Sequence, residues 1–151
     1  MKMKKIFLVL FTLTIVATFL MTPALAADKP IKWKAQAMWS AAELSYKTFV
    51  DFCARVKVLT NGRLEITPYS AGTLVPTFEA LDALQNNVIQ AMHMWPGYFS
   101  GKEPGLAAIS DMVAAYSQPW QKDAWMYYKG GWEMLNEMYK PYNAYAVGWM
   151  F

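Results

Sequence analysis

The residue types best suited to acid–base or metal chemistry are few in this sequence. Its one histidine, His93, stands between Met92 and Met94. A metal site would need a second histidine or a carboxylate at a fixed spacing, and none is close in sequence. The position favours a hydrogen-bonded histidine in or beside a sheet, with contact to a ligand as the alternative.

The sequence also holds one cysteine, Cys53, which lies between Phe49 and Val56 on what reads as a helix face. A single cysteine cannot form a disulfide within the chain, so stability must come from burial. Free cysteines are usually buried and inert. We therefore expect Cys53 to be a small core residue rather than a reactive thiol.

Known catalytic motifs are missing from the sequence. It has no Gly-x-Ser-x-Gly turn, no phosphate-binding loop and no paired metal motif. Acidic residues such as Asp51, Asp82 and Glu137 stand singly on expected helix faces, where they are more simply explained as solvated. An exported α/β enzyme acting on a small molecule is the alternative hypothesis, and turnover of an ester, glycoside or peptide would favour it.

Hydrophobic periodicity predicts strands that alternate with helices. Apolar and polar residues alternate over 31–38, and Ser40 with Glu43 then forms the pattern of a capping box for the next helix. Further strands are expected at 64–69, at 88–95 and from 143 onward, with helices after Pro76 and Pro119 and a break at Gly130-Gly131. This order predicts an α/β fold with a mostly parallel sheet and crossover helices.

The carboxyl ends of these strands are the expected place for a ligand, because open parallel sheets bind ligands there, beside helix amino termini. Three segments meet this condition: 38–40, 72–77 and 95–99. A helix capped by Ser40 would offer free N–H groups and a positive dipole end to an anion such as a carboxylate. The aromatic side chains near these turns are expected to line a cleft, with core packing as the alternative: Trp39, Trp95, Tyr98 and Phe99.

The first 26 residues have the organisation of an export signal. A basic start precedes an apolar run from Ile6 to Met21, and Ala24-Leu25-Ala26 follows as a cleavage site. An uncleaved anchor is the alternative, because the run is near the short limit of about 17 residues for spanning a bilayer. The mature chain would begin near Ala27 or Asp28, without a cysteine for a lipid anchor.

Removing that leader changes the charge balance. Three of the 14 basic residues lie in it, so 11 basic residues face 11 acidic ones in the remainder. Nucleic-acid-binding proteins need an excess of positive charge, so a nucleic acid is not an expected partner. Residues 27–151 suit one domain, and the apolar segment from 143 stops without a turn or polar tail, which reads as the first part of a longer protein.

Four segments stand in order behind the leader: Trp33 to Gln36 with the following helix, Thr60 to Leu64, Gly72 to Pro76 leading to Glu79 to Asn86, and Tyr98 to Pro104. Together they resemble the periplasmic solute-binding proteins of TRAP (tripartite ATP-independent periplasmic) transporters, DctP type, over nearly all of the mature chain. The segment from Tyr98 is most similar to the branch that binds α-keto acids and related monocarboxylates.

The resemblance implies one lobe of a two-lobe periplasmic-binding-protein fold of type II, truncated before the second lobe. It implies that Tyr98 and Phe99 line the substrate site, with Trp39 and Gln118 near the same cleft. A carboxylate-clamping arginine and ligands for a bridging sodium or calcium ion are expected beyond Phe151, so no cofactor is expected within this chain. The run Tyr98-Phe99-Ser100 departs from the usual Tyr-Tyr-Trp-like pattern, which leaves the exact ligand open.

The family's mechanism is closure of two lobes around a solute that is then delivered to membrane subunits. Closure is a population shift driven by ligand contacts with both lobes. The resemblance therefore implies a periplasmic receptor, not an enzyme, whose partners are a small carboxylate and TRAP membrane subunits. A homodimer of the full-length protein is a further possibility, and one lobe alone is expected to bind poorly.

Overall fold

A parallel three-stranded sheet organises the first half of the chain. The computed structural model describes residues 29–112 and 114–148, so the predicted leader and residues 149–151 lie outside the described residues. The strands are β1 (Ile31–Ala37), β2 (Leu64–Tyr69) and β3 (Ala91–His93), in the order β2-β1-β3 with both pairs parallel. The prediction of an α/β fold with a parallel sheet is confirmed.

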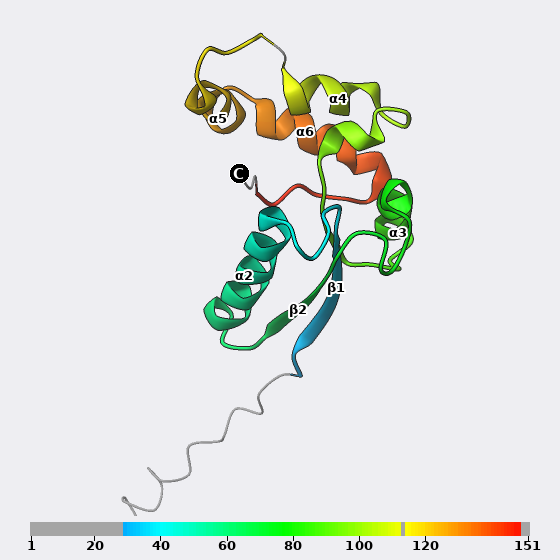
Figure 1. Ribbon diagram of the computed structural model, residues 1–151. Coiled ribbons are helices and arrows are strands. Elements are labelled where there is room, and N and C mark those ends of the chain that lie inside the picture. Colours follow the sequence, from blue (N-terminus) through cyan, green and yellow to red (C-terminus); the bar gives the residue numbers. More distant parts are fainter. Residues whose placement is uncertain (1–28, 113, 149–151) are drawn as a thin grey trace, which may run out of the picture.

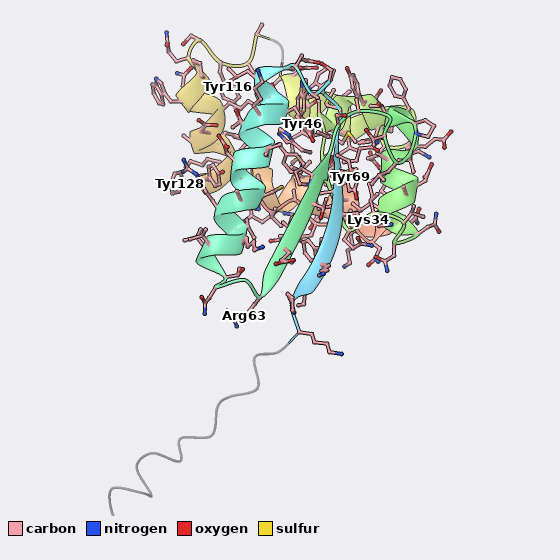
Figure 2. All side chains as sticks on the ribbon, turned by 60° about the horizontal axis from the view of Figure 1, so that its bottom comes forward. Lys34, Tyr46, Arg63, Tyr69, Tyr116 and Tyr128 are labelled. Atoms are coloured by element: carbon pink, nitrogen blue, oxygen red, sulfur yellow. The ribbon has the colours of Figure 1, made fainter. Side chains whose placement is uncertain are left out.

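Helix α2 (Leu44–Leu59) covers one face of this sheet (Figure 1). It buries Phe49 and Cys53 against Ala35 and Ala37 of β1, so Cys53 is a core residue as predicted. The amino-terminal part of α2 lies at the carboxyl end of β2, where the Tyr46 hydroxyl donates a hydrogen bond to the Pro68 carbonyl at 3.3 Å. Figure 2 shows the corresponding side chains, with Tyr46 near the Tyr69 end of β2 and Arg63 at the opposite end.

The remaining helices form a second core. A 3₁₀ turn, η1 (Thr77–Glu79), leads into α3 (Ala80–Gln85), which lies on the side of the sheet away from α2 (Figure 1). Beyond the carboxyl ends of the strands lie η2 (Pro96–Phe99), α4 (Pro104–Asp111), α5 (Pro119–Tyr128), α6 (Gly131–Tyr139) and η3 (Lys140–Tyr142). Their buried apolar side chains, such as Leu81, Leu106, Met126 and Leu135, make one continuous cluster. Within the described residues, none of the helices is both long enough and apolar enough to cross a bilayer.

Strand β3 is shorter than the predicted strand over 88–95. Before β3, Gln90 N–H donates to the Lys34 carbonyl at 2.9 Å, but the Lys34 N–H donates to the Gln90 side-chain oxygen at 2.9 Å and not to a main-chain carbonyl. After β3, Trp95 N–H donates to the Met38 sulfur at 2.9 Å, and Pro96 begins η2. A side-chain acceptor therefore lies at each end of β3, and Pro96 has no N–H with which to continue the ladder.

The predicted final strand is wrong for residues 143–148. Asn143 is in a turn with φ 51°, and residues 144–148 have no strand partner: Ala146 N–H donates to the Asn136 side-chain oxygen at 2.7 Å instead. Its period-two pattern is nevertheless real, because Ala144 and Ala146 pack on the core while Tyr145 and Val147 are exposed. Alternation of apolar and polar residues shows that one face of the segment is covered. It does not show that the segment pairs with a strand.

Two helix starts also differ from prediction. The capping box forms by half: a Glu43 side-chain oxygen accepts from Ser40 N–H at 2.8 Å, but α2 begins only at Leu44. Turns occupy 41–42, so the N-cap is Glu43 and not Ser40.

Helix α4 was not predicted. It begins at Pro104, and the Glu103 carboxylate accepts a hydrogen bond from Gly105 N–H at 3.1 Å. The predicted helices around Gly130-Gly131 are confirmed, with Gly130 at φ 88° between α5 and α6.

Candidate ligand-binding site

A cleft of about 800 Å³ opens beside β3, between the sheet and the chain segment that follows α6. Residues 90–95, which include β3, and residues 144–148 both contribute to its lining. The first turns of α2 contribute Leu44, Ser45 and Thr48. The cleft therefore lies at the open edge of the sheet and reaches the carboxyl end of β1, where Met38 and Trp39 line it.

Three rings join this cleft to the core under α2. The centroids of Trp39 and His93 lie 4.3 Å apart with their planes tilted by 44°. On its other side His93 stacks on Phe49, at 4.9 Å between centroids and 26° between planes. Phe49 is buried in α2, so the His93 ring links a lining residue, Trp39, to an anchored one.

A second ring cluster adjoins the cleft through Trp95, which is one of its lining residues. Trp95 meets the edge of Tyr98 at 5.4 Å between centroids, and Tyr98 lies 5.2 Å from Phe78 of η1. Trp95 and Tyr98 are each 37% exposed, so both rings present area to solvent. Gly97 permits this arrangement, since a Cβ there would lie 3.1 Å from the Trp95 ring. These partly exposed rings suit a flat or apolar part of a small ligand.

The described lining carries no Asp, Glu, Lys or Arg side chain. Burial lowers the pKa of His93 from 6.5 to about 4, so its imidazole is neutral at ordinary pH. Burial also raises the pKa of Tyr139, which lines the cleft as a neutral phenol. A carboxylate at this site would therefore meet uncharged dipoles from this part of the protein and would need its countercharge from elsewhere.

The structure brings together some of the six predicted site residues. Trp39 and Trp95 line the cleft, and Tyr98, which is outside the lining, contacts the Trp95 ring. Ser40 is exposed beside Trp39, outside the lining and without the capping role expected of it. The part of the expected anion site that reaches the cleft is the first turn of α2, through Ser45.

The structure places the other two elsewhere. Phe99 is 1% exposed in the core cluster that includes Leu106 and Ile109, so the expectation that turn-adjacent aromatics avoid the core is wrong for this ring. Gln118 is the exposed N-cap of α5, where its main-chain N–H donates to the Gln121 side chain at 3.0 Å. Neither lies in the described lining of the cleft.

Sequence reasoning missed several lining residues. Ser45 and Thr48 could have been found from the helical period, because they share the face of α2 that begins at Leu44. The segment 144–148 gave no such signal, since its place beside β3 is set by the helices that precede it. Among residues 29–112 and 114–148, no three His, Cys, Asp or Glu side chains gather as metal ligands.

Comparison with known proteins gives one family. The model of the bacterial extracellular solute-binding proteins of family 7, DctP, matches residues 35–147. The chain is also 31% identical, over 123 residues, to a monocarboxylate 2-oxoacid-binding periplasmic protein of Nostoc sp.. That match covers 81% of this chain and 34% of the relative.

Solved structures agree in fold. A TRAP periplasmic solute-binding protein from Rhodobacter sphaeroides, in an apo open structure, gives a TM-score of 0.71 at 30% identity and covers 74% of this chain and 36% of that one. A TRAP transporter solute-binding protein from Bordetella bronchiseptica, with calcium and picolinate in its active site, gives 0.69 at 29% identity, covering 77% and 34%. The chain thus spans about a third of the length of the relatives it matches.

Proposed function

Because the chain belongs to the DctP family of bacterial extracellular solute-binding proteins, we propose that it forms one lobe of a periplasmic receptor for a small monocarboxylate. A 2-oxo acid is the favoured ligand class, since the Nostoc relative is a monocarboxylate 2-oxoacid-binding protein. The observation that carries the proposal is the ring-lined cleft at the carboxyl ends of β1 and β3, which contains Trp39 and Trp95.

We propose that two parts of the receptor bind different parts of the ligand. Its described lining is uncharged, so this lobe would hold the apolar or flat part of the ligand and donate hydrogen bonds from the first turn of α2. The relatives contain further polypeptide that this chain does not span. A positively charged side chain on that further polypeptide would form the ion pair with the ligand carboxylate. We propose Trp39, Trp95 and Tyr98 as the ligand contacts of this lobe, with Ser40 at its rim.

A bound metal ion is a second feature of a relative, because the Bordetella bronchiseptica protein contains calcium with picolinate. A protein-bound calcium ion is coordinated by roughly six to eight oxygen atoms, and the coordination geometry varies. The described residues do not gather acidic side chains for such an ion. We therefore propose that the ligands of any bridging sodium or calcium ion lie outside the described residues.

The proposed receptor acts by binding and release, not by turnover. Closure of two lobes would shield the ligand, and delivery to TRAP membrane subunits would follow reopening. The leader of residues 1–26 would direct the protein to the periplasm after cleavage, in agreement with the periplasmic relative. A ligand recovered unchanged after prolonged incubation would support this role over that of an exported enzyme.

The test is a melting experiment on three proteins: this chain, the Nostoc relative, and a chimera in which residues 35–147 replace the matching segment of that relative. Each is heated with pyruvate, 2-oxobutyrate or picolinate, with and without calcium or sodium. A ligand that binds only the folded state raises the melting temperature in proportion to the logarithm of its concentration. We expect a shift for the chimera and a smaller one for the single lobe.

The parent relative is the control. A folded chimera that shows no shift with any of these acids, while the parent shifts under the same conditions, would contradict the proposed function. Circular dichroism establishes that the chimera is folded before the ligands are compared.

A further inference from the structure

His93 has a position that neither a metal-ligand nor an ion-pair role explains. Its ring lies between Trp39 and Phe49, at 4.3 and 4.9 Å between centroids. Its Nδ1 is buried and has no hydrogen-bond partner among the described residues. A buried nitrogen without a partner is unusual, because hydrogen bonds normally fix a histidine ring. Here ring contacts hold the side chain instead.

The neighbours of the ring exclude a charge-based role. The residues that line the cleft with His93 are uncharged, and the cluster behind it consists of Phe49, Cys53, Ala35 and Ala37. Burial lowers the pKa of His93 to about 4 and raises that of Cys53 to about 11, so both groups are neutral near pH 7. The imidazole is therefore a flat, neutral spacer.

We propose that His93 is a positioning residue, whose ring holds the Trp39 indole in the wall of the cleft by contact with Phe49 behind it. The part concerning ligand affinity rests on the proposed receptor function. The part concerning the Trp39 ring does not, because it follows from the ring contacts alone.

A chain of ring contacts runs from the buried face of α2 to the wall of the cleft. Phe49 is 4% exposed in the middle of α2 and cannot move without disturbing the core. Trp39 itself lies in a bend after β1 and before the turn at 41–42, and its indole packs against the edge of the core cluster that contains Phe49. Removing the ring between the two would leave the indole free to leave the wall, and the ligand would have to reorder it on binding.

Three variants separate the ring from its nitrogens. His93→Phe keeps a flat ring, His93→Gln keeps hydrogen-bonding groups without a ring, and His93→Leu keeps bulk alone. A ring pair contributes about 0.5–1.5 kcal/mol beyond its buried area, which corresponds to roughly two- to tenfold in Kd. In the chimera with the Nostoc relative we expect His93→Gln and His93→Leu to weaken 2-oxo acid binding by that factor and His93→Phe to leave it within about twofold.

A spectroscopic measurement on the whole chain needs no ligand. With 5-fluorotryptophan in all seven tryptophan positions, Trp39→Phe identifies the Trp39 ¹⁹F signal. We expect His93→Leu and His93→Gln to move or broaden that signal and leave the signal of Trp120, which is 64% exposed on α5, unchanged. We expect His93→Phe to retain a dispersed Trp39 signal, and the wild-type signal to stay constant from pH 8 to 6.

The outcomes are decisive in both directions. An unchanged Trp39 ¹⁹F signal in His93→Leu would overturn the positioning role. Normal 2-oxo acid binding by the His93→Gln chimera, together with weakened binding by the His93→Phe chimera, would overturn it as well. If no acid binds any version of the chimera while the Trp39 signal responds as expected, the proposed function fails and the ring contact stands.

Discussion

Gln36 and Val75 are joined by two hydrogen bonds through the interior of the protein. The Gln36 Nε2 donates to the Val75 carbonyl at 2.8 Å, and Val75 N–H donates to Gln36 Oε1 at 3.1 Å. The same oxygen accepts from Leu74 N–H at 2.7 Å, and Gln36 is fully buried. One side chain of β1 thus fixes the loop that leads into η1 and carries Phe78 toward Tyr98.

Replacing this amide should be costly. In Gln36→Leu the half-buried N–H groups of Leu74 and Val75 lose their acceptor, which we expect to destabilise the fold by roughly 2–4 kcal/mol. Urea denaturation followed by circular dichroism measures the change. Gln85→Leu is the matched control, because Gln85 is exposed and makes one 3.2 Å bond to the Pro141 carbonyl. Equal losses for the two variants would contradict the structural role of Gln36.

The Cys53 thiol should be inert in the folded chain. Its side chain is 3% exposed and burial raises its pKa to about 11, so roughly one molecule in a thousand would carry a thiolate at pH 8. We expect reaction with Ellman's reagent to be slow in buffer and to reach completion quickly in urea. Cys53→Ser gives the background. Fast reaction of the native chain would contradict burial of this residue.

His93 should make stability depend on pH. Its pKa is about 4 in the folded chain against an ordinary value of 6.5, so the unfolded chain binds the proton more tightly. Its contribution to stability is therefore complete above pH 6.5 and is lost as the pH falls toward 4. Because solvent reaches part of the ring, we expect a loss of roughly 1–2 kcal/mol rather than the full value of the shift.

The measurement compares wild type with His93→Phe, so that titration of the carboxylates cancels. The difference in unfolding free energy between the two proteins should change between pH 7 and pH 4.5, with wild type losing more stability. Parallel curves across that window would show that His93 titrates alike in the folded and unfolded chains.

The sequence predicted those parts of the fold whose signals are local. The alternation in β1 and the helical period of α2 each require one covered face, and both elements are present. The length of β3 could not be predicted from a local signal, because the Gln90 and Met38 side chains accept hydrogen bonds from residues far away in the sequence. The segment 143–148 kept the alternation of a strand without any strand to pair with.

The candidate site was predictable in place more than in detail. The rule that ligands lie at strand carboxyl ends led to Trp39 and Trp95, which share one cleft. It could not distinguish Tyr98 from Phe99, since adjacent residues in a turn face different ways. Phe99 is buried with residues of α4, and the short run of apolar residues after Pro104 did not predict that helix.

The contact between α5 and α6 should be intolerant of one added methyl group. A Cβ at Gly131 would lie 2.3 Å from Trp125 Cζ3 and 2.9 Å from the Met126 Cα, and the main-chain atom cannot move aside easily. We expect Gly131→Ala to cost about 1–3 kcal/mol, the usual range for an overpacked core. Gly101→Ala is the control, because nothing lies within 4 Å of its added Cβ. A neutral Gly131→Ala would mean that α5 and α6 pack less closely.

Two tryptophans of the same cleft should differ in their effect on ligand binding. Trp33 lines it from within β1, where it pairs with Ile66 of β2, whereas Trp95 lines it beyond the end of β3. If the ligand occupies the carboxyl end, Trp95→Leu in the chimera with the Nostoc relative should weaken 2-oxo acid binding tenfold or more, roughly, as central interface rings do. Trp33→Leu should change binding by less than about threefold.

Isothermal titration calorimetry measures both dissociation constants, and melting curves without ligand correct for lost stability. The comparison is informative because both variants remove the same side chain from one continuous cleft. A larger loss for Trp33→Leu would move the site toward the part of the cleft that Trp33 lines from within β1. Trp39, Trp95 and Tyr98 would then lie beside the path to the ligand without contacting it, and the hydrogen bonds proposed from the first turn of α2 to the ligand would not form.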